Sequence, residues 1–112
     1  MPKHDDIVSL RHMLDHAREA VEMIASKTPE DLRKERMLEL ALVRLVEIIG
    51  EAAGRVSRTG QAKYPEIPWR EVIGMRNRLI HGYDSIDLKV LWDTIELDFP
   101  PLIVQLETSL HV

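Results

Sequence analysis

The stretch KYPEIPWREVIGMRNRLIHGY, residues 63–83, contains signals for both ends of one helix, and its last turns concentrate arginine, asparagine and histidine side chains. Pro68 suits the first turn of a helix, where a missing N–H costs no hydrogen bond. Gly82 suits the position just past a helix C-terminus, where a left-handed backbone is often required. The sequence therefore predicts a helix from Trp69 to about His81.

This predicted helix has an apolar stripe with a polar flank beside it. The stripe consists of Val72, Met75 or Ile73, Leu79 and Ile80. The flank carries Arg76, Asn77, Arg78 and His81, with Tyr83 just beyond the glycine. Arg78 and His81 are neighbours at i, i+3, and a histidine in the last turn gains from the helix dipole when it is protonated. The stripe predicts a core contact, and the flank predicts a site.

Helical periodicity continues through the rest of the chain. One amphipathic helix is predicted from Asp5 to Ser26, and a long one from the low thirties to about Ser57. Residues 58–68 read as irregular, because Gly60, Pro65 and Pro68 interrupt the pattern. No strand pattern is present.

Local signals set the remaining helix boundaries. Thr28 and Pro29 mark a helix start, and Asp87 can cap a helix that begins at Leu88. Pro100 and Pro101 should kink or break that last helix, since neither has a backbone N–H to donate. The predicted fold is an all-α bundle of four main helices in a single domain, residues 1–112, with room for a short extra helix after Thr28.

Composition narrows the classes of function. The chain of 112 residues has a net charge of −4 and no cysteine, which excludes disulfides, thiolate metal sites and cysteine nucleophiles. It has no apolar run of membrane length, so we expect a cytoplasmic protein with no membrane partner. Residues 55–81 are the exception in an acidic chain, with six Lys or Arg against two Asp or Glu. This distribution predicts a local anion site rather than a broad surface for polyanions.

A titratable histidine beside arginines is the minimum equipment for phosphodiester chemistry. His81 would move a proton to or from a ribose oxygen, and an arginine would stabilise charge on the phosphoryl group. This chemistry needs neither a metal nor a cofactor. The alternative on these residues alone is that the arginines form surface salt bridges with nearby acids.

The segment RNRLIHGY, residues 76–83, has the form Arg, four residues, His, any residue, Tyr, and it resembles the motif of HepT-like toxins in the HEPN superfamily. Two further blocks resemble the family in the same order: LVEIIGEAAGRVS, residues 45–57, and DLKVLWDTIELDFPPL, residues 87–102. The N-terminal helix resembles the family only as an amphipathic helix. The resemblance therefore rests on ordered blocks across most of residues 37–106.

The resemblance implies a HEPN-type helical homodimer that acts as a metal-independent endoribonuclease, with Arg76 and His81 as the catalytic pair. It implies the toxin half of a type VII-like toxin–antitoxin pair. The antitoxin would be a cognate minimal nucleotidyltransferase that adds AMP to Tyr83. Asn77 matches a polar position that would orient phosphate, and Arg78 stands at a variable position whose role is open. The implied partners are RNA, a second copy of the chain and the nucleotidyltransferase.

Glutamates on the long helix are candidate supporting residues. Glu51, and less strongly Glu47, can pair with Arg76 or Arg78 and orient them; the alternative is pairing with Arg44 or Arg55 on the same helix. The small residues Gly50, Ala53 and Gly54 mark a face expected to join the dimer interface, together with the helix of residues 69–81.

Four alternatives stay open on the sequence. His12 and His16 have the i, i+4 spacing of a metal site or of a solvated helix face. Trp69 and Trp92 suit core or interface anchors better than base-stacking platforms. Tyr83 is either the modified residue or a tyrosine that packs on Trp92 and bonds Asp87. The competing functions are a non-catalytic helical module that binds nucleotide or the partner nucleotidyltransferase, and a purely structural dimerisation domain.

Overall fold

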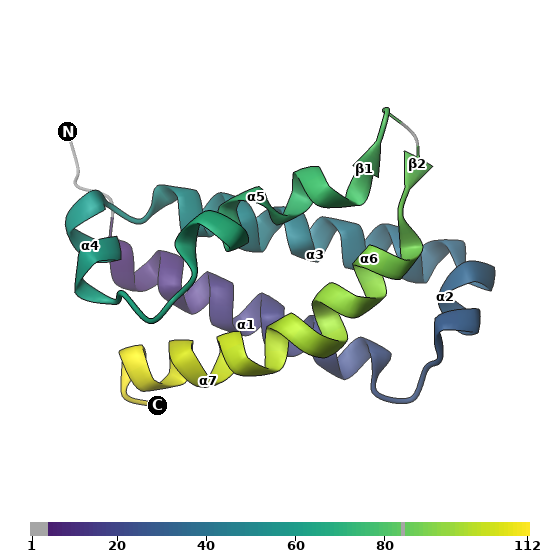
Figure 1. Ribbon diagram of the computed structural model, residues 1–112. Helices are drawn as coiled ribbons and strands as arrows, with labels where there is room; N and C mark the ends of the chain where they lie inside the picture. Colours follow the sequence, from purple (N-terminus) through teal and green to yellow (C-terminus); the bar gives the residue numbers. More distant parts are fainter. Residues whose placement is uncertain (1–4, 84) are drawn as a thin grey trace.

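A computed structural model describes residues 5–83 and 85–112, and its described elements are nearly all helical (Figure 1). In chain order they are α1 (Asp6–Ile24), α2 (Pro29–Lys34), α3 (Arg36–Arg55), α4 (Arg58–Lys63), α5 (Trp69–Leu79), β1 (Ile80–His81), β2 (Ser85–Ile86), α6 (Leu88–Asp93), the π-helical segment η1 (Thr94–Asp98) and α7 (Phe99–Leu110). The predicted all-α class, with four long helices, is confirmed.

The core lies between the long helices. Helix α1 packs against α3 on one side and α7 on the other, and α5 lies along α3 (Figure 1). The largest fully buried side chains are Leu10, Met13, Leu14, Leu32, Leu42, Ile49, Ile67, Leu79, Leu91, Ile95, Phe99 and Leu106. Each such side chain contributes roughly 1.5–3 kcal/mol on burial, so the apolar stripes of the sequence hold the bundle together.

The predicted extra helix is present as α2. The Thr28 hydroxyl accepts from the Asp31 backbone N–H at 3.2 Å, and the Asp31 carboxylate accepts from the Thr28 N–H at 2.9 Å. This reciprocal pair satisfies two N–H groups that the helix itself cannot use. The extended backbone of Glu35 then separates α2 from α3, so the long helix begins at Arg36, later than predicted.

Residues 58–68 are more regular than the sequence predicts, because Ser57 caps the short helix α4. The Ser57 hydroxyl accepts from the Gly60 N–H at 2.9 Å and donates to Asp6 of α1 at 2.6 Å, while its backbone N–H also donates to Asp6 at 3.0 Å. Trp69 secures the following loop, because its indole N–H donates to the carbonyls of Gln61 and Tyr64. Trp69 is therefore an anchor, as predicted.

The end of α5 differs from the prediction. The helix ends at Leu79, and His81 lies in β1, which pairs with β2 in an antiparallel ladder. The carbonyl of Leu79 accepts from the backbone N–H of Asp87 at 2.7 Å, so a residue from beyond the turn takes the place of a helical partner. Gly82 has a positive φ of 77° inside the hairpin turn rather than at a helix end. The expected gain of His81 from the helix dipole is therefore absent.

The last helix is not broken at its two prolines. The chain continues from α6 through η1 into α7, and the Phe99 N–H donates five residues back, to the carbonyl of Thr94. Pro100 and Pro101 have no N–H to donate to the preceding turn, so the backbone adopts the wider π-helical turn just before them. The predicted break is a local change of helix type.

The small residues of α3 are used inside the protomer. Gly50 and Ala53 are buried, and a Cβ at Gly50 would lie 3.4 Å from the carbonyl oxygen of Val72. The prediction that Gly50 and Ala53 form a dimer face is therefore wrong, since both are buried within the protomer and α5 of the same chain lies against Gly50. Gly54 alone of the three is exposed.

In the part of the chain that the structure describes, none of the helices combines the length and the apolar character needed to cross a bilayer.

Gly60 should be sensitive to a single added carbon. A Cβ there would overlap the Asp6 carboxylate and lie 2.9 Å from Val56 Cγ1. We expect Gly60→Ala to displace Asp6 from Ser57 and to lower the free energy of unfolding by about 1–3 kcal/mol. Gly54→Ala is the matched control, because a Cβ there meets nothing within 4 Å; it should be neutral or stabilising. Urea unfolding of both variants measures the difference, and equal stability would contradict the close contact.

Candidate active site

Arg76 lies in the last turn of α5 and faces α3. Its Nε donates to Glu47 Oε2 at 2.9 Å, and half of the Arg76 side chain stays exposed. The two helices run antiparallel and cross where Gly50 meets Val72. Arg76 lies one turn after Val72 on α5, and Glu47 lies one turn before Gly50 on α3. Because the helices are antiparallel, these two residues come to the same level and meet.

Glu51, the supporting residue expected from the sequence, is paired elsewhere. Its Oε1 lies 3.6 Å from Arg44 Nη1, and the same Arg44 lies 3.8 Å from Glu47 Oε1. Glu51 thus takes the alternative partner on its own helix, and Glu47 takes the role of orienting Arg76. Glu47 therefore contacts two arginines, Arg44 and Arg76, and its single negative charge cannot neutralise both.

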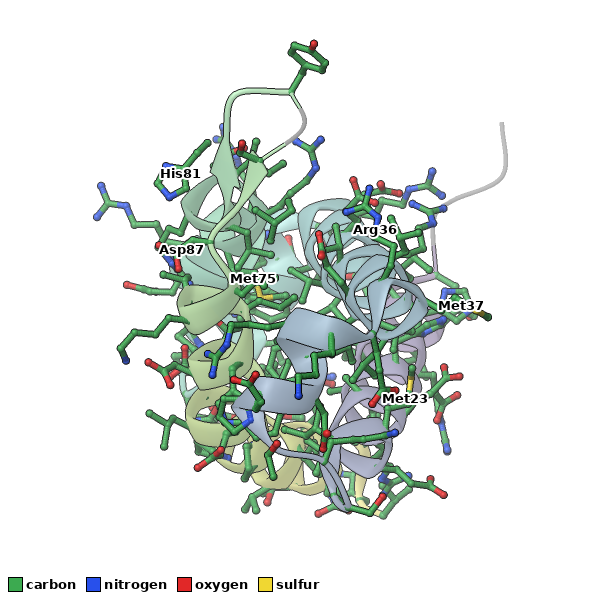
Figure 2. The ribbon with its side chains drawn as sticks, turned by 90° about the vertical axis from the view of Figure 1, so that its right-hand side faces the viewer. Met23, Arg36, Met37, Met75, His81 and Asp87 are labelled. Carbon is green, nitrogen blue, oxygen red and sulfur yellow. The ribbon has the colours of Figure 1, made fainter. Side chains whose placement is uncertain are left out.

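His81 is held by a different element. Its Nε2 lies 3.4 Å from Asp87 Oδ2, and Figure 2 shows the ring beside Asp87 at this end of the molecule. Asp87 Oδ1 accepts from the Val90 N–H at 3.1 Å and caps α6, as predicted. The Val90 hydrogen bond, followed by the bond to His81, lowers the pKa of Asp87 below its ordinary value.

Arg78 and Asn77, the other polar motif residues on α5, do not join Arg76 at α3. Arg78 Nη1 donates to the Glu71 carbonyl at 3.2 Å, on the flank toward α7. There Arg78 belongs to the rim of a cavity of about 420 Å³ between α5 and the η1–α7 segment, with apolar walls that include Met75 and Phe99. Asn77 is exposed. The structure therefore places Arg76 and Arg78 on opposite flanks of one helix.

Tyr83 is fully exposed in the hairpin turn, with a relative accessibility of 104%. Trp92 is buried instead, and its indole N–H donates to the Glu96 carboxylate one turn further along the chain. The alternative in which Tyr83 packs its ring on Trp92 is therefore wrong. Trp92 is a core residue, as predicted.

The histidine pair of α1 lies outside this cluster. His16 Nδ1 lies 2.6 Å from the His12 carbonyl, and the two rings meet edge to face at 6.2 Å. They line a second cavity, of about 520 Å³, whose other polar residues are Ser9, Arg44, Glu51 and Arg55. Within residues 5–83 and 85–112, no three His, Cys, Asp or Glu side chains come together as a metal site.

The sequence missed Asp87 as a partner of His81 and ranked Glu51 above Glu47. Asp87 lies six residues after His81, with Gly82 between them, which is compatible with a hairpin that returns the chain. No periodic pattern distinguishes Glu47 from Glu51, because both lie on one side of α3, a turn apart.

The ionisation of Asp87 should make the stability of the folded protein depend on pH in the acid range. Because its pKa in the folded protein lies below the ordinary 3.8, the ionised carboxylate stabilises the native state above about pH 4. That contribution is lost as the pH falls through the lowered pKa. We expect wild type to have a higher Tm than Asp87→Asn at about pH 6 and the difference to vanish near pH 2. Thermal unfolding at several pH values checks this, and a difference independent of pH would contradict it.

Comparison with known proteins identifies the family. A family model described as ribonuclease HepT-like matches residues 13–109. A relative named "Probable ribonuclease HepT", from Thermococcus cleftensis, is 39% identical over 98 residues, which cover 84% of this chain and 89% of the relative. A protein named as a "Putative RNase" from Caldanaerobacter subterraneus subsp. tengcongensis is 35% identical over 91% of each chain.

A further "Putative RNase", from Methanocaldococcus jannaschii, is 33% identical over 96% of this chain and 98% of the relative. No solved structure matches the chain significantly. The helical bundle fits a HEPN-like fold. Because the family model and the relatives span nearly the whole chain, this protein belongs to the HepT-like ribonuclease family.

Proposed function

We propose that this ribonuclease-family protein is a metal-independent endoribonuclease toxin, in which Arg76 and His81 carry the reaction. The observation that supports it most is the way the two groups are held. Each is at least half exposed, and each is oriented by a carboxylate from another element, Glu47 for Arg76 and Asp87 for His81. A surface arginine and histidine without such partners would sample many rotamers, whereas catalysis needs fixed geometry.

The proposed reaction is an internal transfer on RNA. His81 accepts the proton of a ribose 2′-hydroxyl, whose oxygen attacks the adjacent phosphorus. The bond from phosphorus to the 5′-oxygen breaks, and that oxygen receives a proton, which leaves a 2′,3′-cyclic phosphate and a 5′-hydroxyl. Arg76 stabilises the negative charge on the pentavalent phosphorane with its planar guanidinium.

The acidic net charge limits affinity rather than excluding RNA. The basic segment of residues 55–81 supplies a local field, but a chain with a net charge of −4 releases few counterions from RNA. Cleavage should therefore be slow or selective, and the affinity for RNA should be low and depend only weakly on salt concentration.

The cleavage test uses labelled RNA and the matching DNA in EDTA. We expect RNA to be cut with cyclic phosphate ends and DNA to stay intact, since DNA lacks the 2′-hydroxyl. His81→Ala should abolish cleavage, and Arg76→Lys should reduce it by about 100-fold or more, because an ammonium cannot form the same fork of hydrogen bonds.

A matched pair of glutamate variants tests whether the orientation of Arg76 matters for cleavage. Glu51→Gln should cleave nearly as well as wild type, while Glu47→Gln should be impaired, because Glu47 alone of the two contacts Arg76. Cleavage of DNA, or full activity in His81→Ala, would contradict the mechanism. RNA bound but left uncut by wild type would instead favour a non-catalytic nucleotide-binding module.

We also propose a homodimer with a shared cleft. Arg76 faces α3 and His81 faces the N-terminus of α6, so one protomer presents its two groups on different sides of the α5 end. Pooling the groups of two protomers would assemble a fuller constellation. Exposed apolar side chains supply a contact surface on α3 and α5: Met37 is 85% exposed, Leu40 52% and Ile73 42%.

The dimer test uses charge placed on that surface. Leu40→Glu should give a monomer by light scattering at micromolar concentration, with loss of RNA cleavage, because a charge cannot be buried unpaired at an interface. Leu97→Glu is the matched control, since Leu97 is 62% exposed on η1, which is not part of the proposed contact surface. A monomeric wild type that still cleaves RNA would contradict the shared cleft.

Regulation is proposed at Tyr83, within a type VII-like toxin–antitoxin pair. The partner would be a cognate minimal nucleotidyltransferase. The tyrosine hydroxyl would attack the α-phosphorus of ATP and form a phosphodiester to AMP, releasing pyrophosphate. Support comes from the full exposure of Tyr83 two residues beyond His81, where an enzyme can reach it without unfolding a helix. The added AMP would repel substrate phosphate and occupy its space.

Co-expression with a minimal nucleotidyltransferase tests the switch. We expect AMP on Tyr83 by peptide mass spectrometry and loss of RNA cleavage in the modified protein. Tyr83→Phe should keep its activity and escape neutralisation. Tyr64→Phe is the control, because Tyr64 lies far along the chain from the motif and is partly buried. Modification elsewhere, or neutralisation of Tyr83→Phe by transfer of AMP, would contradict the assignment.

A further inference from the structure

Asp87 makes two contacts with its two carboxylate oxygens. Oδ1 accepts from the Val90 N–H at 3.1 Å and caps α6, and Oδ2 faces His81 Nε2 at 3.4 Å. The cap fixes the rotation of the carboxylate, so the oxygen aimed at His81 is fixed as well. The hydrogen bond to the first turn of α6 thus positions Oδ2 toward His81.

The backbone holds the two residues opposite each other. The Asp87 N–H donates to the Leu79 carbonyl at 2.7 Å, and the short ladder pairs Ile80 with Ile86 and His81 with Ser85. The ammonium of the nearby Lys89 forms its hydrogen bond with Asp93, at 2.7 Å, rather than with the Asp87 carboxylate. Asp87 therefore remains available to the imidazole.

This geometry distinguishes the two ring nitrogens of His81. The lowered pKa of Asp87 keeps the carboxylate ionised at neutral pH, and an ionised carboxylate only accepts hydrogen bonds. In the neutral imidazole, the nitrogen that faces Asp87 must therefore carry the proton. That nitrogen is Nε2, which leaves the lone pair on Nδ1.

We propose that Asp87 is a positioning residue that holds His81 as its Nε2–H tautomer, so that Nδ1 is the nitrogen that accepts the proton of the ribose hydroxyl. The inference rests on the proposed RNA cleavage for its catalytic consequence, but the tautomer itself is a property of the free protein. The proton accepted on Nδ1 gives an imidazolium that Asp87 stabilises through Nε2. Nδ1 can then return the proton to the 5′-oxygen.

Asp87→Asn is the sharpest variant, because asparagine keeps the cap and reverses the hydrogen bond. Its carbonyl oxygen can accept from Val90, as N-cap asparagines do, which leaves the amide N–H₂ facing His81. His81 Nε2 must then accept, and the proton moves to Nδ1. We expect kcat to fall about 100-fold or more while KM changes by less than about threefold, since the wrong tautomer binds substrate but cannot take its proton.

Asp87→Ser separates the cap from the pairing. Serine also caps a helix, but its short side chain does not reach His81. Its kcat should fall less than that of Asp87→Asn, by about tenfold, because a free ring still populates the working tautomer. Asp93→Asn is the control on the same helix, since Asp93 pairs with Lys89 rather than His81, and it should cleave RNA at the wild-type rate. Circular dichroism confirms that each variant is folded.

A second readout needs no activity. Long-range proton–nitrogen NMR in alkaline buffer reports which ring nitrogen carries the proton, and the His81 signals are assigned by their absence in His81→Gln. We expect Nε2–H in wild type and Nδ1–H in Asp87→Asn. Full activity in Asp87→Asn, or Nδ1–H in wild type, would overturn the proposal. A wild type that cuts no RNA but shows Nε2–H would contradict the proposed function and leave the positioning by Asp87 supported.

Discussion

The close antiparallel contact between α3 and α5 sets the geometry on which the site depends. It needs a small residue at position 50, because even a Cβ there would lie in van der Waals contact with the Val72 carbonyl oxygen, at 3.4 Å. The contact fixes how far α5 slides along α3. Glu47 and Arg76 meet as a consequence of that register, and the end of α5 is placed where the hairpin can return toward α6.

Carboxylates orient Arg76 and His81 of the proposed site without contributing much to the stability of the fold. The pairs are partly exposed, and exposed pairs are typically worth at most about 1 kcal/mol, screened further by salt. The bundle itself is held by apolar burial. This division lets the surface of the α5 end carry groups chosen for geometry, while the core beneath it carries the free energy of folding.

Sequence patterns predicted well what short-range chemistry decides. Thr28 and Asp87 begin helices because each side chain bonds a backbone N–H three residues on, and the apolar stripes bury the predicted faces. The end of α5 was predicted two residues late, because the group that ends it, the Asp87 N–H, arrives from eight residues away. The choice between Glu47 and Glu51 needed the level at which two helices cross, which periodicity does not contain.

Two other differences also have long-range causes. Small residues such as Gly50 and Ala53 predict a close approach, but they do not say whether the neighbour belongs to the same chain. Pro100 and Pro101 remove two N–H donors, and the sequence does not say whether the helix ends or widens. In this fold α7 packs along α1, which favours a continuous rod with a π-helical turn.

The hairpin has a consequence for how the protein responds to warming. Arg76 belongs to a long helix packed on the core, whereas His81 lies in a two-residue ladder, which is held by Ile80 and Ile86 at the edge of the core, a backbone hydrogen bond at Leu79 and the carboxylate of Asp87. A short element with few hydrogen bonds among its described residues opens locally at a lower free energy than the long helices of the bundle. Amide hydrogens of the hairpin should exchange with solvent long before those of α3. On warming, the hairpin should therefore open, and His81 should lose its fixed position relative to Arg76, at a temperature below the Tm of the helical bundle.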